Sequence, residues 1–486
     1  VKNNKEAVKD ALNAVYKLDF KMVTSSKTPE EMQTIYEKIT RRLGNTLTVS
    51  EMSKYRDGHC ETGLTDKEKR SPSKIVSKWL SENCIGCGMC SLICPHAVIR
   101  PFLIKEDKGI LDPVHKEYHY YVCISEKDCT GCGLCVSICP GKQGKKALFL
   151  GEKTTDESEK YFNYQNPKLY PKFTVKGSQL EEPKFAFSGA CAGCGETAYI
   201  KLLTQLYKDE LVIANATGCS SIYGGTFMST PYKLPWANSL FEDNAEFAYG
   251  MHHSYKLKRN RLKKIILENK EKASPSLNNL YEEFLNNFNS FEKTLALKEA
   301  FLKEDIPEEL KELIDYVPYR TVVALGGDGW AYDIGFDGID HVLSSNENVK
   351  IMVLDTEVYS NTGGQMSKSS HIGAVCEFAD EGKKVYKKDL FKIAMCYPNC
   401  YVASICLGAN PMQAIKAMKE AMEHDGPSLI LCYAPCIEHG IKGGMACSLE
   451  EEKLAVKVGY SLLMRYHPNE EKLYLDYKTP DFTKYH

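Results

Sequence analysis

From residue 185 onward, short apolar runs alternate with stretches whose apolar residues recur at helical spacing. The apolar runs predict buried strands, and a period of about 3.6 residues predicts amphipathic helices. The predicted strands are Leu211–Ala214, Thr321–Leu325, Lys350–Leu354, Tyr401–Ile405 and Ser428–Cys432, and the predicted helices include Thr197–Tyr207 and Pro411–Glu423. Because strands and helices alternate, we expect an α/β fold with a mainly parallel sheet and helices on both faces.

The helix expected over Pro411–Glu423 has the strongest local signals. Asn410 suits the N-cap, a proline occupies the first helical position, and Ile415, Met418 and Met422 share one face. Residues 257–312 interrupt the alternation with a charged, helix-rich stretch, which we expect to be an insertion or an outer layer. The last residues, about 20 in number, are polar and aromatic and predict no particular element.

The N-terminal part has a different pattern. Residues 1–43 predict two amphipathic helices. Their apolar faces consist of Val8, Leu12 and Val15 for the first, and of Met32, Ile35 and Ile39 for the second. Residues 44–80 are polar and basic and predict a connecting arm, while residues 151–184 have no period and predict an extended linker.

Composition and charge narrow the class of protein. Lys plus Arg (62) nearly balances Asp plus Glu (64), so nothing favours nucleic acid or an anionic membrane. No apolar run reaches about 18 residues, so we expect no bilayer span. The first residues have no apolar stretch typical of a signal peptide, and the absence of an initial Met fits a fragment or a processed piece. We expect a cytoplasmic protein of an anaerobic prokaryote or protist, and an organelle stays open.

Two identical cysteine blocks dominate the middle of the chain. Each has the spacing C-x2-C-x2-C-x3-C-P, which is typical of a ferredoxin with two [4Fe–4S] clusters. In that arrangement three neighbouring cysteines bind one cluster and the fourth crosses to the other. The first expected set is Cys84, Cys87, Cys90 and Cys139, and the second is Cys129, Cys132, Cys135 and Cys94. A zinc ribbon would need only four thiolates and no C-x2-C-x2-C run.

A further set of cysteines lies outside these blocks. Cys191 and Cys194 form a C-x2-C pair. Cys219 and Cys436 each follow a predicted strand, and strand ends converge on one edge of a parallel sheet. Spacing alone leaves zinc and a third [4Fe–4S] cluster open, and the neighbouring two-cluster domain favours iron–sulfur. Cys432 competes with Cys436, but its place inside an apolar strand favours a buried structural thiol.

Two glycine-rich loops follow the strands Thr321–Leu325 and Lys350–Leu354. In the first, Gly326–Trp330, Asp328 stands between glycines and suits a Mg²⁺ ligand. The second, Asp355–Gly364, is rich in Thr, Asn and Gly and offers further oxygen ligands. Glycines allow the backbone to approach a phosphate closely. Ordinary turns are the alternative, but the two loops together resemble the fingerprint of thiamine diphosphate sites.

The combination of these sites resembles the C-terminal part of the pyruvate:ferredoxin (or flavodoxin) oxidoreductase family. The resemblance covers about residues 45–445 and is most specific at Gly189–Glu196, Ala216–Gly225, Gly326–Gly335 and Asp355–Gln365. It implies that Asp328, Thr356 and the backbone oxygen of Val358 bind Mg²⁺. It implies a proximal cluster on Cys191, Cys194, Cys219 and Cys436. It implies that thiamine diphosphate is lined by Glu196, Cys219, Gly327, Asp328, Gly329, Trp330, Thr356, Val358 and Asn361, of which Glu196 and Asn361 are the candidate catalytic residues.

The resemblance implies an activity and partners. Pyruvate and coenzyme A would be converted to acetyl-CoA and CO2, and three [4Fe–4S] clusters would pass electrons to ferredoxin or flavodoxin. The N-terminal domains of the family, which complete its cofactor site, have no counterpart here. We therefore expect N-terminal domains or a companion chain to supply the other half, in a homo-oligomer of the full enzyme. Two alternatives stay open: another 2-oxo acid, or an electron-transfer fragment that is inactive alone.

These patterns predict four parts. Residues 1–80 would be a helical and connecting segment, the tail of a preceding domain. Residues 81–150 would form a small α+β domain with two clusters, joined by the linker 151–184 to a thiamine diphosphate-binding domain over residues 185–486.

Overall fold

The structure, a computed structural model, describes residues 2–15, 34–56, 58, 60–67, 69–154, 158–225 and 230–477. The chain divides into two compact units, Val1–Cys60 and Glu61–His486. The first contains α1 (Lys2–Asn13), α2 (Ile35–Thr40) and α3 (Val49–Met52). α1 agrees with the first predicted helix, although Val8 is exposed. On the second predicted face, Met32 lies outside the described residues and Ile35 is buried at the start of α2.

The second unit contains an eight-stranded sheet with the order β15-β14-β12-β13-β9-β8-β6-β7. Its strands are β6 (Leu211–Asn215), β7 (Trp236–Asn238), β8 (Thr321–Gly327), β9 (Val349–Asp355), β12 (Tyr401–Ile405), β13 (Ser428–Tyr433), β14 (Met464–His467) and β15 (Lys472–Leu475). All neighbours from β7 to β12 pair in parallel, and β14 and β15 add an antiparallel edge. The α/β prediction and its five strands are confirmed.

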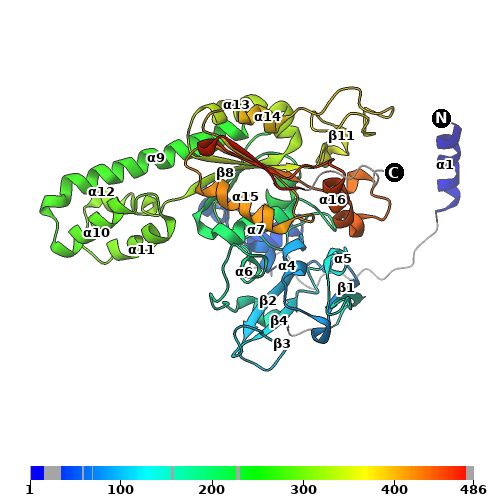
Figure 1. Ribbon diagram of the computed structural model, residues 1–486, viewed down its shortest axis with the longest axis horizontal. Coiled ribbons are helices and arrows are strands. Elements are labelled where there is room, and N and C mark those ends of the chain that lie inside the picture. Colours follow the sequence, from blue (N-terminus) through cyan, green and yellow to red (C-terminus); the bar gives the residue numbers. More distant parts are fainter. Residues whose placement is uncertain are drawn as a thin grey trace. The chain divides into compact units, whose positions relative to one another are not determined.

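Helices cover both faces of this sheet (Figure 1). Successive side chains of a strand point to opposite faces. Thus Val323 and Leu325 join the core on one face, whereas Val322 and Ala324 join the core on the other. The first face is covered by α7 (Thr197–Tyr207) and α15 (Pro411–Glu423), and the second by α9 (Asn244–Asn269), α13 (Phe336–Ser344) and α14 (Leu390–Met395). Both predicted helices, α7 and α15, have the expected bounds.

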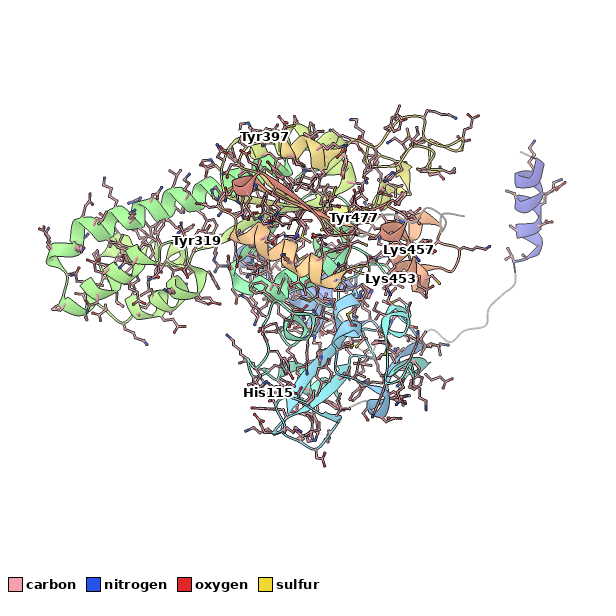
Figure 2. The ribbon with its side chains drawn as sticks, in the orientation of Figure 1. His115, Tyr319, Tyr397, Lys453, Lys457 and Tyr477 are labelled. Atoms are coloured by element: carbon pink, nitrogen blue, oxygen red, sulfur yellow. The ribbon has the colours of Figure 1, made fainter. Side chains whose placement is uncertain are left out.

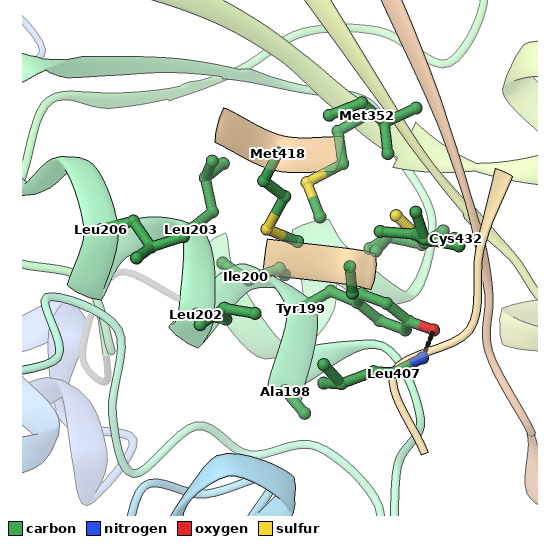
Figure 3. Packing of buried hydrophobic residues seen from close by; sticks show 14 of the residues in the cluster. Ala198, Tyr199, Ile200, Leu202, Leu203, Leu206, Met352, Leu407, Met418 and Cys432 are labelled. Atoms are coloured by element: carbon green, nitrogen blue, oxygen red, sulfur yellow. Dashed lines mark hydrogen bonds between the residues drawn. The ribbon is translucent and has the colours of Figure 1, made fainter. Parts of the chain in front are cut away.

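Helix α7 is fixed firmly against the sheet (Figure 3). Its Leu203 belongs to the same buried cluster as Met418 of α15 and Met352 of β9. The buried Tyr199 hydroxyl accepts a hydrogen bond from Leu407 N (2.8 Å) and donates one to the Tyr433 carbonyl (2.7 Å). Because Tyr199 satisfies its polar atom inside the core, the N-terminal end of α7 is held in one position.

The predicted helix-rich insertion forms a lobe that extends away from the sheet (Figure 1). It consists of the C-terminal half of α9 with α10 (Pro275–Asn286), α11 (Phe291–Phe301) and α12 (Glu308–Lys311), around its own core of Ile266, Tyr281, Phe284 and Phe301. Tyr319 lies where this lobe joins β8 (Figure 2). Its N–H donates to Thr294 Oγ1 (2.8 Å), and its hydroxyl accepts from Asn348 Nδ2 (2.9 Å).

The cysteine blocks belong to a small antiparallel region. It contains β2 (Ile99–Ile104), β3 (Ile110–Leu111) and β4 (His119–Ile124) in one sheet, β1 (Ile75–Trp79) paired with β5 (Leu148–Glu152), and the short helices α4 (Met89–Ile93) and α5 (Leu134–Ile138). α4 and α5 begin after Gly88 (φ 79°) and Gly133 (φ 82°), both left-handed. This equivalence agrees with the internal repeat, since glycine adopts that conformation without steric cost.

Some elements were not predicted. β14 and β15 lie in a polar stretch, and β7 is too short to give a clear pattern. The expected linker 151–184 contains α6 (Val175–Gln179). Around the site, the structure adds α8 (Cys219–Gly225), α16 (Ser448–Lys457) and a hairpin of β10 (Val358–Tyr359) with β11 (Gln365–Met366). Among the described residues, no helix combines the length and apolar character needed to cross a bilayer.

Candidate thiamine and iron–sulfur sites

The loops that follow β6, β8 and β9 meet at the carboxyl edge of the sheet. They surround a cavity of about 170 Å³. All nine predicted cofactor residues line it: Glu196, Cys219, Gly327, Asp328, Gly329, Trp330, Thr356, Val358 and Asn361. Six further residues line the cavity, namely Thr217, Gly218, Phe241, Tyr359, Ser360 and Thr362. Five of them lie in the stretches Ala216–Gly225 and Asp355–Gln365, to which the sequence points, whereas Phe241 comes from a loop with no motif.

Oxygen atoms from two loops converge at the base of this cavity. Thr356 Oγ1 lies 3.1 Å from Asp328 Oδ1 and 3.1 Å from the Val358 carbonyl oxygen. Ser360 Oγ lies 2.7 Å from the same Thr356 hydroxyl. Ser367 Oγ donates to Asp328 Oδ2 at 2.5 Å. The structure thus brings the three predicted Mg²⁺ ligands together, and it adds Ser367, which lies too far along the chain to be predicted from spacing.

The Asp328 carboxyl is almost fully buried, with 1 % of its surface exposed. Burial, and then the neighbouring Asp355, raise the pKa of Asp328 well above its ordinary value. Asp355 itself accepts a hydrogen bond from Tyr332 Oη (2.9 Å) and pairs with Lys387 Nζ (2.9 Å). Asp355 therefore has a cationic partner, whereas the direct partners of Asp328 are the hydroxyl groups of Thr356 and Ser367.

Gly329 allows close packing beside the cavity. A Cβ at this position would lie 2.5 Å from Cε1 of Tyr359. The aromatic ring thus occupies the space that a side chain would take, and glycine is required for the loop to approach the ring.

Glu196 lies at the N-terminal end of α7 and faces the same cavity. It is buried, and its Oε2 accepts a hydrogen bond from Tyr223 Oη (2.7 Å). Burial raises the pKa of Glu196 to about 7, although the Tyr223 hydrogen bond acts in the opposite direction. Asn361, the other candidate catalytic residue, is exposed at the cavity.

The fourth cysteine of each block lies near cysteines of the other block. Cys94, Cys129, Cys132 and Cys135 line one small cavity. Burial raises the pKa of Cys132 to about 11, and the nearby Cys94 and Cys129 act in the same direction. Burial likewise raises the pKa of Cys87, and here the neighbours are Cys84 and Cys139. Each fourth cysteine therefore lies with the three cysteines of the other block.

Backbone N–H groups point at several of these sulfurs. Gly86 N donates to Cys84 Sγ (3.4 Å), Ala147 N to Cys139 Sγ (3.3 Å) and Ser77 N to Cys129 Sγ (3.5 Å). Such hydrogen bonds stabilise thiolates and are one of the means by which proteins set cluster potentials.

The third cysteine set lies beside the thiamine cavity. Burial, and then Glu196, raise the pKa of Cys219, with contributions from Cys194, Cys436 and Cys191. The other three predicted ligands are therefore within electrostatic reach of Cys219, which also lines the cavity. Cys432 is instead packed in the core of the first sheet face, as expected for a structural thiol.

In the described part of the chain, no three Cys, His, Asp or Glu side chains form a group that could hold a single metal ion.

Comparison with known proteins agrees with these sites. Residues 311–432 match the C-terminal TPP-binding domain of thiamine pyrophosphate enzymes, residues 83–142 match a 4Fe-4S dicluster domain, and residues 18–71 match a domain of unknown function. The chain therefore contains a thiamine pyrophosphate domain and a two-cluster iron–sulfur domain.

Curated relatives share this combination. The chain is 44 % identical over 481 residues to the pyruvate-flavodoxin oxidoreductase of Klebsiella pneumoniae, covering 92 % of the chain and 41 % of the relative. It is 42 % identical over 505 residues to the pyruvate:ferredoxin oxidoreductase of Moorella thermoacetica, covering 95 % of the chain and 43 % of the relative. The chain is thus homologous to these oxidoreductases and spans about two fifths of their length.

Proposed function

We propose that this chain is the C-terminal part of a pyruvate:ferredoxin or pyruvate:flavodoxin oxidoreductase. The reaction would be oxidative decarboxylation of pyruvate with coenzyme A to acetyl-CoA and CO2. One observation carries the proposal: Cys219 belongs both to the thiamine cavity and to the third cysteine set, so a redox centre would adjoin the cofactor. The names of the homologous relatives point to the same substrate.

The oxygen atoms at the cavity base fit Mg²⁺. Octahedral coordination with Mg–O distances of about 2.05 Å places neighbouring ligand oxygens about 2.9 Å apart. The distances from Thr356 Oγ1 to Asp328 Oδ1 and to the Val358 oxygen, 3.1 Å each, are close to that edge. A cation would also compensate the buried Asp328 carboxylate. Asp328, Thr356 and Val358 would therefore hold Mg²⁺ against the cofactor diphosphate.

Thiamine diphosphate, when bound, supplies the electron sink for loss of CO2. The loops 327–330 and 356–361 would orient its diphosphate end. Glu196, buried and bonded to Tyr223, would hold a proton close to the reacting part of the cavity. Asn361, exposed at the mouth, would contact the substrate. The remaining half of the site would come from N-terminal domains or a companion chain in a homo-oligomer, because this chain spans only part of its relatives.

Three [4Fe–4S] clusters would form a path for single electrons. A Cβ on Gly193, between Cys191 and Cys194, would lie 3.7 Å from Cys132 Cβ. The set of Cys94, Cys129, Cys132 and Cys135 would therefore be the middle cluster, and the set of Cys84, Cys87, Cys90 and Cys139 the outer one. Exposed Lys142 and Lys145 follow Cys139 and would attract an acidic ferredoxin or flavodoxin.

The proposed domain limits follow the same division: a leading segment to residue 80, the two-cluster domain over 81–150, the linker 151–184 and the thiamine domain from 185. We place the enzyme in the cytoplasm. A second candidate function, electron transfer by a fragment inactive alone, is favoured by the partial coverage of the relatives.

The deciding experiment is anaerobic viologen reduction by the full-length enzyme that carries this chain. Thiamine diphosphate, Mg²⁺ and coenzyme A are supplied, pyruvate is compared with 2-oxoglutarate, and iron is measured in parallel. We expect reduction that requires pyruvate and coenzyme A, and about twelve irons per chain, or three clusters of four. Reduction only with 2-oxoglutarate would replace pyruvate as the proposed substrate. Intact clusters without reduction by either acid would favour a protein that only transfers electrons.

A further inference from the structure

Lys201 is a buried cation between the thiamine domain and the cysteine repeat. It lies on α7, with 1 % of its surface exposed. Its Nζ donates to the carbonyl oxygens of Leu92 (2.9 Å) and Cys94 (3.1 Å), and also to that of Ser91. It therefore caps the C-terminal end of α4, directly before a predicted cluster ligand. The hydrogen-bond partners of its Nζ in the described part of the chain are these three backbone carbonyl oxygens.

Arg100 is a second buried cation close to the same ligand, with 7 % of its surface exposed. Its Nε donates to the Ala97 carbonyl (3.1 Å), and its guanidinium lies 4.6 Å from the ring of Phe162 and 4.9 Å from that of Phe187. Its Nη2 is buried and has no hydrogen-bond partner in the described part of the chain. Arg100 thus keeps part of its charge uncompensated.

The nearest carboxylates do not neutralise these cations. Asp66, Glu182 and Asp128 act on Arg100 at a distance. However, Asp66 and Glu182 are bonded to Lys233, and Asp128 to Lys69. Lys201 is within electrostatic reach of Arg100 and of Cys94, and less strongly of Cys90 of the outer set, and Arg100 is within reach of Cys94. Two like charges in a buried region need an anion nearby, since little water is present to screen them.

The internal repeat supplies a comparison within the molecule. The two blocks are offset by 45 residues, from Cys84 to Cys129, so Ser91 and Leu92 correspond to Val136 and Ser137. Lys146 Nζ donates to the carbonyl oxygens of Val136 (2.7 Å) and Ser137 (3.4 Å). Each short helix is therefore capped by a lysine at equivalent carbonyls.

The two caps differ in their surroundings. Lys146 is exposed, whereas Lys201 is buried. By the same offset, the buried Arg100 corresponds to the exposed Lys145. Water screens the charges beside the outer cysteine set, while the charges beside the middle set act through a medium of low dielectric constant.

We infer that Lys201 and Arg100 are positioning residues that raise the reduction potential of the cluster held by Cys94, Cys129, Cys132 and Cys135 above that of the outer cluster. The inference rests on the proposed function, because it requires both clusters. A [4Fe–4S] cluster with four thiolates has a net negative charge, and reduction adds one electron. Unscreened cations stabilise this added charge, and net charge is one of the factors that set cluster potentials.

The consequence concerns the direction of electron flow. The middle cluster, next to the proximal set, would accept electrons before the outer cluster does. Since α7 begins beside Glu196 and carries Lys201, one rigid helix links the thiamine cavity to the charge that favours this transfer.

The test is an EPR-monitored redox titration of the anaerobic full-length enzyme that carries this chain. We expect Lys201→Gln, which removes the charge but keeps hydrogen-bond donors, to shift the higher of the two ferredoxin-type potentials downward. Lys201→Arg, which keeps the charge, should leave it close to that of the wild type. Lys146→Gln is the matched control at the equivalent cap and should shift either potential far less.

Four outcomes decide between the inference and its failure. Unchanged potentials in Lys201→Gln with both signals intact, or equal shifts in Lys201→Gln and Lys201→Arg, would overturn the inference. If Lys201→Gln fails to assemble clusters, Arg100→Gln decides, because it should lower the same potential and leave the outer cluster unchanged. Absence of two ferredoxin-type signals from the wild-type enzyme would instead overturn the proposed function.

Discussion

One side chain at the carboxyl edge of the sheet is central to the proposed metal site. Asp328 is the only acidic side chain among the three proposed Mg²⁺ ligands, and it is buried with two hydroxyl groups as direct partners. A cation would offset the cost of burying its carboxylate, so under the proposal this residue would couple cofactor affinity to Mg²⁺.

Asp328→Asn should weaken Mg²⁺-dependent binding of thiamine diphosphate by about 10-fold to 100-fold, because a neutral amide is a poorer ligand for a hard cation. The affinity can be measured by titration of cofactor into the full-length apoenzyme at saturating Mg²⁺. Asp333→Asn is the matched control, since Asp333 lies five residues later and pairs with Lys368 outside the ligand set. Equal affinity in the wild type and Asp328→Asn would contradict the assignment.

Glu452 gives a pH-dependent stability that is independent of the metal sites. Its Oε2 accepts hydrogen bonds from Gly408 N (2.6 Å) and Cys406 Sγ (3.2 Å) inside the protein. Burial raises the pKa of Glu452 to about 7 from 4.5. The folded state therefore binds a proton more tightly than the unfolded state between these values, and this contribution to stability falls as pH rises from 4.5 to 7.

Glu452→Gln should remove this dependence. When the pH is lowered from 7 to 5.5, the free energy of unfolding of the wild type should rise relative to that of the variant by roughly 2 kcal/mol at most. This follows from about 1.4 kcal/mol for each pH unit between the two pKa values. Thermal unfolding of both proteins at pH 5.5 and pH 8 measures the difference. Glu450→Gln, at an exposed position of the same helix, should track the wild type at both values. A constant difference between the wild type and Glu452→Gln would argue against a raised pKa.

At the scale of elements, the sequence predicts the bounds of helices and strands well where the apolar residues alone form the buried side. β12, α7 and α15 have the bounds predicted from apolar runs and period, because their apolar residues are the ones that pack in the core. β14 was missed because its sequence is mixed: Arg465 is buried there only by virtue of pairing with Glu420 and Asp476. Ser367 and Phe241 were missed for a related reason, since their place at the site depends on folding rather than on spacing.

The cap of α15 provides a test at this scale. Asn410 Oδ1 accepts a hydrogen bond from Gln413 N (3.1 Å), and its loss in Asn410→Ala should destabilise the first turn by about 1 kcal/mol. If that turn opens locally, hydrogen–deuterium exchange of its amides should become about fivefold faster. Met412→Ala, at a half-exposed site of the same turn, should have little effect. Unchanged exchange in Asn410→Ala would show that tertiary packing alone fixes the turn.

At the scale of the whole molecule, the sequence located the three cysteine sets but did not show their order. The order depends on the approach of Gly193 to Cys132, which joins two regions far apart in the chain. Because the third set adjoins both the thiamine cavity and the middle set, the proposed electron path would have to pass through it.

Cys436→Ser should interrupt this path while leaving both ends intact. Iron should fall from about twelve to about eight per chain, since one cluster of four is lost and the ferredoxin-type clusters remain. Thiamine diphosphate should still bind, because Cys436 does not line the cavity. Pyruvate-dependent viologen reduction should be lost, whereas dithionite should still reduce the two remaining clusters.

Cys432→Ala removes a thiol four residues away that is packed in the core, so it should keep about twelve irons and the electron path. Loss of iron in Cys432→Ala rather than in Cys436→Ser would mean that Cys432 on β13 is the cluster ligand. The proposed link between the cofactor and the clusters through Cys436 would then be wrong.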